Sequence, residues 1–203
     1  NGVPAYIAKH ASDHVSILNA GESDVSHPTQ GLLDLLTIRL HKGGFDNLTV
    51  AIVGDIAHSR VARSAAEGLS KMCVEDLRLV SPESLAPEPG SVPAEAQIMH
   101  DLDEGMRGAD VVMALRIQRE RITNLEGIPG VDEYFAHYGV SSERMKLAAA
   151  DAIVMHPGPM NRGIEIESKL ADSACSVITE QVRNGVAVRM AVLASVVRTL
   201  DGQ

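Results

Sequence analysis

Residues 48–64, Leu-Thr-Val-Ala-Ile-Val-Gly-Asp-Ile-Ala-His-Ser-Arg-Val-Ala-Arg-Ser, decide the fold class of this chain. The run Leu48–Gly54 is apolar apart from Thr49, which is typical of a strand that is buried on both faces. A helical pattern begins at Val61, directly after a polar turn that contains Arg60. A strand of this kind that leads into a helix predicts an α/β fold with a parallel sheet.

The same alternation of short apolar runs and longer helical patterns continues along the chain. The other predicted strands are Val15–Leu18, Asp76–Val80, Ala96–Met99, Asp110–Leu115 and Ala152–Met155. The clearest predicted helices are Pro28–His41, Val61–Met72, Leu102–Gly108, Val131–Tyr138 and Ser176–Leu200. We therefore predict a doubly wound parallel sheet at 45–160, flanked by hinge helices and the remnant of a second α/β domain. The Pro/Glu-rich stretch Ser81–Pro93 is expected to be a surface loop.

The last predicted helix is amphipathic. Its apolar stripe, which we expect to pack against the rest of the protein, consists of Val186, Met190, Leu193 and Val197. The chain also opens at Asn1 with a segment that reads as the end of an element, as in a fragment.

Composition narrows the classes of function. The chain has 203 residues, of which 45% are hydrophobic, so it is too apolar to be disordered. A formal net charge of −9 argues against nucleic acid and anionic lipid as partners. Only Cys73 and Cys175 are present, without zinc-ligand spacing, which favours a reducing, cytoplasmic location. No apolar run is long enough to span a membrane, and no signal peptide is apparent.

In an open α/β sheet, ligands bind beyond the carboxyl ends of the strands, so the polar residues that follow the predicted strands are the candidates for a binding site. The first such segment is His27-Pro28-Thr29-Gln30. Pro28 suits the first position of a helix, which places His27 at the cap and Gln30 in the first turn. Both side chains then reach one point in front of a helix N-terminus, where anions are favoured. A plain helix cap with a solvated histidine is the alternative.

The turn after Leu48–Gly54 lacks both GxGxxG and the P-loop lysine motif, which disfavours a dinucleotide site. Arg60 stands instead at the start of a helix, where a cation gains nothing from the helix dipole and so needs an anionic partner. The alternative is an exposed arginine on a solvated turn.

The predicted strand Asp110–Leu115 runs into 116–121, Arg-Ile-Gln-Arg-Glu-Arg. In an extended chain, Arg116, Gln118 and Glu120 point to one side, and Ile117 and Arg119 to the other. A guanidinium beside an amide suits a carboxylate next to an amine, since arginine grips a carboxylate with two parallel hydrogen bonds. The alternative is a charged, solvated loop.

The predicted strand Ala152–Met155 leads into His156-Pro157-Gly158-Pro159. Its two prolines lack N–H groups, so the turn presents bare carbonyl acceptors that suit the N–H groups of a ligand. Gly158-Pro159 is also a candidate for a cis peptide bond. A rigid connection without a ligand is the alternative.

In order and spacing, these four motifs together resemble the aspartate carbamoyltransferase family, and the resemblance extends to the segment Val188–Leu193. In the related ornithine carbamoyltransferases, the late turn carries a cysteine after its histidine, whereas this chain has Pro157. The resemblance implies that 1–44 belong to a carbamoyl-phosphate domain and a hinge helix. It further implies that 45–160 bind aspartate and that 161–203 return to the first domain.

The implied reaction transfers the carbamoyl group of carbamoyl phosphate to L-aspartate in pyrimidine biosynthesis, without a metal or organic cofactor. His27 would donate to the carbamoyl oxygen. Gln30, with the turn Pro157, Gly158 and Pro159, would hold the carbamoyl amide. Arg60 and Arg116 would bind the two carboxylates of aspartate, with Gln118 beside the second.

The family also implies a homotrimer, with dihydroorotase or regulatory chains as further partners. The family's Ser-x-Arg-Thr-Arg phosphate motif does not occur in this sequence, so we expect little turnover from the chain alone. Two alternatives stay open at this point: a non-catalytic scaffold subunit for dihydroorotase, and an acceptor other than aspartate, such as ornithine.

Overall fold

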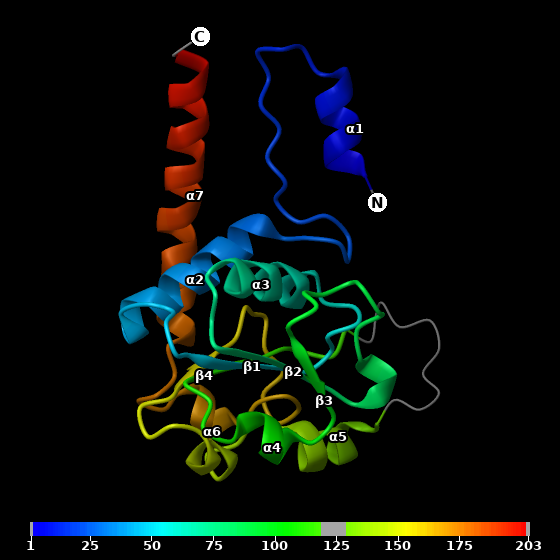
Figure 1. Cartoon of the computed structure of the whole chain (residues 1–203), viewed down its shortest axis with the longest axis vertical. Helices are drawn as coiled ribbons and strands as arrows, with labels where there is room; N and C mark the ends of the chain where they lie inside the picture. Colours follow the sequence, from blue (N-terminus) through cyan, green and yellow to red (C-terminus); the bar gives the residue numbers. More distant parts are fainter. Residues whose placement is uncertain (1, 119–128, 202–203) are drawn as a thin grey trace.

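The computed structural model describes residues 2–118 and 129–201, and Figure 1 shows their arrangement. Five parallel strands form one sheet in the order β3-β2-β1-β4-β5. The strands are β1 Thr49–Val53, β2 Asp76–Val80, β3 Gln97–Met99, β4 Val111–Ala114 and β5 Ile153–Met155. This order reverses direction between β1 and β4, which makes the sheet doubly wound, as the sequence predicts.

Helices cover both faces of the sheet, as Figure 1 shows. One face packs against α2 (Pro28–Lys42) and α3 (Arg60–Lys71), with Val50 and Ile52 of β1 in that core. The alternate residues Ala51 and Val53 point into the opposite core, beneath α4 (Leu102–Met106) and α6 (Ser168–Ala171). α5 (Val131–Tyr138) lies on this second side as well. Burial on both faces explains why β1 is apolar from Val50 onward.

Residues at the N-termini of α2 and α3 determine where these helices begin. Pro28 occupies the first turn of α2 after His27, where a missing N–H costs nothing. Ser59 caps α3, because its Oγ accepts a hydrogen bond from the Ala62 N–H over 3.1 Å. The domain boundaries at 44 and 160 stay a prediction.

The prediction of a strand at Val15–Leu18 is wrong. This stretch is irregular and joins α1 (Val3–His10) to α2, beyond the sheet in Figure 1. Val15 and Leu18 are 46% and 40% exposed. An apolar run becomes a strand only where a sheet edge and a core receive it, and among the described residues neither lies beside this segment.

The loop Ser81–Pro93 is not confined to the surface, because Leu85 is fully buried beside Ile117 and Tyr134. The Ala57 N–H donates to the Leu85 carbonyl over 3.0 Å, which ties the loop to the end of β1. The loop therefore supports the segment that follows the central strand.

The expected packing of the last helix, α7 (Ile178–Asp201), is also wrong. Gln181 and Asn184 near its start form hydrogen bonds with α2 residues, and the helix then projects away from the sheet (Figure 1). The predicted stripe is open to solvent, with exposed fractions of 55–65% for Val186, Met190, Leu193 and Val197. Within the described residues, no helix combines the length and apolarity that crossing a membrane requires.

Candidate functional site

A cavity of about 250 Å³ opens beyond the carboxyl ends of β1, β4 and β5, where the strand order reverses. It is lined by His27, Gln30, Ser59, Arg60, Val61, Leu115, Arg116, Gln118, His156, Pro157, Gly158 and Pro159. Every site residue predicted from the sequence is among them. The structure thus brings these residues together, and the role of each one stays a prediction.

The ends of β1 and β4 approach closely at Gly54. A Cβ at this residue would lie 2.4 Å from the Leu115 carbonyl oxygen, and its φ of +136° is rarely adopted by other residues. The chain therefore needs glycine here, at the point where it turns from β1 toward Arg60 and where Arg116 follows on the neighbouring strand.

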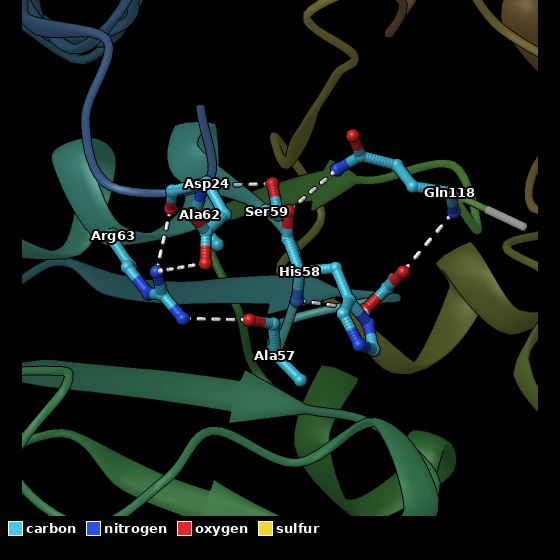
Figure 2. A network of polar contacts seen from close by, with 8 residues as sticks. Asp24, Ala57, His58, Ser59, Ala62, Arg63 and Gln118 are labelled. Carbon is cyan, nitrogen blue, oxygen red and sulfur yellow. Dashed lines mark hydrogen bonds and ion pairs between the residues drawn. The ribbon is translucent and has the colours of Figure 1, made fainter. Parts of the chain in front are cut away.

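A buried carboxylate locks the two loops to each other. Asp55 is fully buried, and its Oδ1 accepts from the His58 N–H over 3.1 Å and lies 2.8 Å from His58 Nδ1. Its Oδ2 accepts from the Gln118 backbone N–H over 3.1 Å, while Gln118 Nε2 donates to the His58 carbonyl over 3.1 Å (Figure 2). The Gln118 side chain is consequently held beside the turn that carries Arg60.

The segment before α2 is attached to the same turn. Arg63 donates to the Ala57 carbonyl over 2.7 Å and to the Asp24 carbonyl over 2.6 Å (Figure 2). The Arg60 guanidinium lies against Gly21, where a Cβ would be 2.8 Å from Arg60 Cζ. These contacts fix the approach of the chain to His27.

His27 stands at the N-cap of α2, and its backbone N–H donates to Ser64 Oγ over 2.8 Å. Its Nδ1 is buried without a hydrogen-bond partner among the described residues, which leaves Nε2 as the ring nitrogen for a ligand. Burial lowers the pKa of His27, and the charges of Arg60 and Arg189 lower it further. The imidazole is thus neutral at pH 7 and carries one N–H.

The turn after β5 offers only acceptors to a ligand. Pro157 and Pro159 have no N–H, and the Gly158 N–H donates to His156 Nδ1 over 2.9 Å. That contact places the His156 proton on Nε2, which lies 3.1 Å from Glu165 Oε1 in a buried pair. The Gly158-Pro159 bond is cis, as predicted. Any polar contact between a ligand and the backbone of 157–159 must therefore use the carbonyls.

The Gln30 amide is held from behind by a buried carboxylate. Gln30 Nε2 donates to Asp34 Oδ1 over 2.9 Å, and the same oxygen accepts from Gln181 Nε2 over 2.7 Å. Burial raises the pKa of Asp34 to about 7, although both hydrogen bonds oppose the shift. The nitrogen end of the Gln30 amide is thus turned toward Asp34, while the Gln30 side chain lines the cavity.

The predicted alternation after β4 is confirmed for the residues that the structure describes. Arg116 and Gln118 line the cavity, while Ile117 is buried against Leu85 and Tyr134 on the other side. The rest of this motif, Arg119, Glu120 and Arg121, lies outside the described residues.

The sequence analysis missed the supporting residues Asp34, Asp55 and Gln181. Two of them could have been found from the sequence. Asp55 is an acid placed directly after a predicted buried strand, and Asp34 lies one helical turn beyond Gln30, where the two side chains can meet. Gln181 had no such signal, because it meets Asp34 only through tertiary packing of positions 147 residues apart.

Comparisons with known proteins agree with this architecture. Residues 46–196 match the family model for the Asp/Orn-binding domain of aspartate/ornithine carbamoyltransferases. The structure of ornithine carbamoyltransferase from Thermus thermophilus is 28% identical, with a TM-score of 0.80 over 95% of this chain and 62% of that one.

Aspartate transcarbamoylase from Trypanosoma cruzi, solved with carbamoyl aspartate and phosphate, is 31% identical, with a TM-score of 0.74 over 87% of this chain and 57% of that one. Ornithine carbamoyltransferase from Gloeobacter violaceus is 30% identical, with a TM-score of 0.72 over 85% of this chain and 59% of that one. The chain thus spans 57–62% of the length of these relatives. With three quarters of its sequence matched to the Asp/Orn-binding domain, the chain belongs to the aspartate/ornithine carbamoyltransferase family.

Proposed function

We propose that the protein transfers the carbamoyl group of carbamoyl phosphate to the amine of L-aspartate, giving N-carbamoyl-L-aspartate and phosphate. One observation carries the proposal: two arginines from neighbouring strand ends, Arg60 and Arg116, share a cavity with the acceptor-only turn at 157–159. Such a cavity matches a dicarboxylic amino acid beside a carbamoyl group, because cations meet carboxylates and carbonyl oxygens meet an NH₂ group.

In the proposed reaction, the aspartate amine attacks the carbamoyl carbon. The new C–N bond forms as the C–O bond to phosphate breaks, phosphate leaves with the electron pair, and the amine proton passes to the departing phosphate. Neutral His27 would donate its remaining N–H to the carbamoyl oxygen, where negative charge develops. A single donor of this kind contributes about 3 kcal/mol to the transition state in other enzymes. Gln30 and the carbonyls of Pro157 and Gly158 would accept from the carbamoyl NH₂.

Arg60 would bind the α-carboxylate of aspartate and Arg116 its side-chain carboxylate, with the Gln118 amide alongside. Ornithine would instead bring a positively charged ammonium group toward the Arg116 guanidinium, and the two like charges would repel each other. The cavity therefore favours aspartate, although structural relatives of both kinds match this chain. We extend the proposal to pyrimidine biosynthesis and to a homotrimer. No observation on the described residues favours the scaffold function.

Calorimetric titration of the 203-residue chain tests the acceptor. We expect binding of N-carbamoyl-L-aspartate but not of L-citrulline, which is the corresponding product from ornithine. Arg116→Ala should weaken binding about 100-fold, since it leaves a carboxylate without its charged partner. Arg107→Ala is the matched control, because this exposed arginine pairs with Glu104 outside the cavity. Preference for L-citrulline, or binding of neither product, would overturn the proposal.

A further inference from the structure

A buried chain of hydrogen bonds joins the start of α7 to both acceptor groups of the cavity. Gln181 Oε1 accepts from the backbone N–H of His156 over 3.0 Å, at the beginning of the turn 157–159. Gln181 Nε2 donates to Asp34 Oδ1 over 2.7 Å, and Gln30 Nε2 donates to the same oxygen over 2.9 Å. Asp34 and Gln181 are each 1% exposed. We call Gln181, Asp34 and Gln30 the amide relay.

The orientation of each amide in the relay is dictated by its neighbours. A backbone N–H can only donate, so the end of Gln181 that faces His156 must be the oxygen. The nitrogen of Gln181 then faces Asp34 Oδ1, which must accept. Asp34 Oδ2 is buried without a partner among the described residues, so a proton bound by this carboxyl resides there and leaves Oδ1 an acceptor. Gln30 consequently turns its nitrogen inward in either charge state of Asp34.

We propose that Gln181 and Asp34 are positioning residues, which make the cavity selective for a carbamoyl group by holding the Gln30 oxygen, and not its NH₂, toward the ligand. This inference rests on the proposed function. Without the relay, the Gln30 amide could rotate and present its N–H donors, which would suit an ester or carboxylate oxygen and not a carbamoyl NH₂ group. Gln181 also contacts the turn through His156, so one residue aligns both sets of acceptors.

The test compares two ligands of equal charge and nearly equal shape, N-carbamoyl-L-aspartate and N-acetyl-L-aspartate, in which CH₃ replaces NH₂. We expect the wild-type chain to bind the carbamoyl compound at least about tenfold more tightly, since the methyl group leaves the acceptors unpaired. Gln181→Met and Asp34→Leu should lower this preference, the ratio of the two Kd values, at least about threefold, while the carbonyls of Pro157 and Gly158 still pair with the NH₂ group. A loss of stability alone would weaken both ligands equally and would not change this ratio.

Two variants serve as controls. Asp34→Asn keeps an oxygen at the position of Oδ1 and mimics the protonated carboxyl, so it should retain the wild-type ratio. Asn184→Leu removes another hydrogen bond between α7 and α2, from Asn184 Nδ2 to Thr37 Oγ1 over 2.9 Å, and should retain the ratio as well. An unchanged ratio in Gln181→Met and Asp34→Leu would overturn the proposal.

The side-chain NH₂ signals of Gln30 in an NMR spectrum give a readout that needs no ligand. We expect signals that are protected from exchange with solvent in wild type and in Asp34→Asn, and rapidly exchanging signals in Asp34→Leu. If wild type binds neither ligand, the proposed function fails. The NMR spectrum alone then shows whether Asp34 holds the Gln30 amide in place. An equally protected Gln30 amide in Asp34→Leu would refute this role of Asp34.

Discussion

The backbone N–H of Gln118 donates to Oδ2 of Asp55 over 3.1 Å, so a carboxylate at the end of β1 fixes the loop that follows β4. The same carboxylate holds His58 through Oδ1, within the turn that leads to Arg60. The cations of the cavity thus sit on two loops joined by one buried side chain. Their spacing depends on Asp55, although Asp55 itself is absent from the cavity lining.

Asp55→Asn should therefore impair both stability and ligand binding. The new NH₂ group would face a backbone N–H, and a buried group left without a partner costs about 1–3 kcal/mol. Urea unfolding measures this loss, and calorimetry should show weaker binding of N-carbamoyl-L-aspartate. Glu67→Gln is the control, because this exposed carboxylate pairs with the exposed Lys71 and should change stability by less than about 1 kcal/mol. Equal effects in the two variants would contradict a central role for Asp55.

Asp34 predicts a pH dependence of folding. Its pKa is about 7 in the folded chain and near 3.8 when unfolded, so the folded state binds the proton more tightly. The sign follows from linkage: the contribution to stability is present at low pH and is lost as the pH rises toward 7 and beyond. Relative to Asp34→Asn, wild type should lose on the order of 3 kcal/mol of unfolding free energy between pH 5 and pH 8. Denaturant titrations across that range measure the difference, and a constant gap between the two proteins would exclude a raised pKa.

Gly54→Ala should destabilise the chain severely. A methyl group there would collide with the backbone of Leu115, and φ is +136°. Gly90→Ala provides the comparison, since φ is also positive at +81° but nothing lies within 4 Å of the added carbon. We expect a cost of about 1–2 kcal/mol from backbone strain at Gly90 and several-fold more at Gly54, measured by thermal or urea unfolding. Similar values at both positions would mean that the ends of β1 and β4 lie further apart than described.

Two identical substitutions test the exposure of α7. Met190 is 65% exposed on the apolar stripe, whereas Met113 of β4 is completely buried. Met190→Ala should change the unfolding free energy by less than about 0.5 kcal/mol, and Met113→Ala should reduce it by about 2–5 kcal/mol. A large loss at Met190 in the isolated chain would show that the stripe packs after all.

Sequence patterns that span only a few residues were enough to predict the strands of the sheet and most of the helices. A run such as Leu48–Gly54 is apolar on both faces only when both are buried, and Pro28 or Ser59 marks a helix start by local hydrogen bonding. Val15–Leu18 has the same local character but lacks a sheet edge, and the stripe on α7 is amphipathic but lacks a covering surface. Such surroundings are supplied by distant parts of the chain, so they leave no trace in the local pattern.

The amino-acid sequence by itself determined the parallel α/β class, the segments that follow each strand and the types of group that they carry: guanidinium, amide, imidazole and bare carbonyl. Only the tertiary structure decided that these groups share one cavity and that the nitrogen of the Gln30 amide is turned toward Asp34. The physical reason is range. Strand and helix periodicities and the missing N–H groups of proline act over a few residues. The hydrogen bonds that Asp34 accepts from Gln181 and Asp55 accepts from Gln118 join positions 147 and 63 residues apart. These bonds exist only once the sheet and its helices have packed.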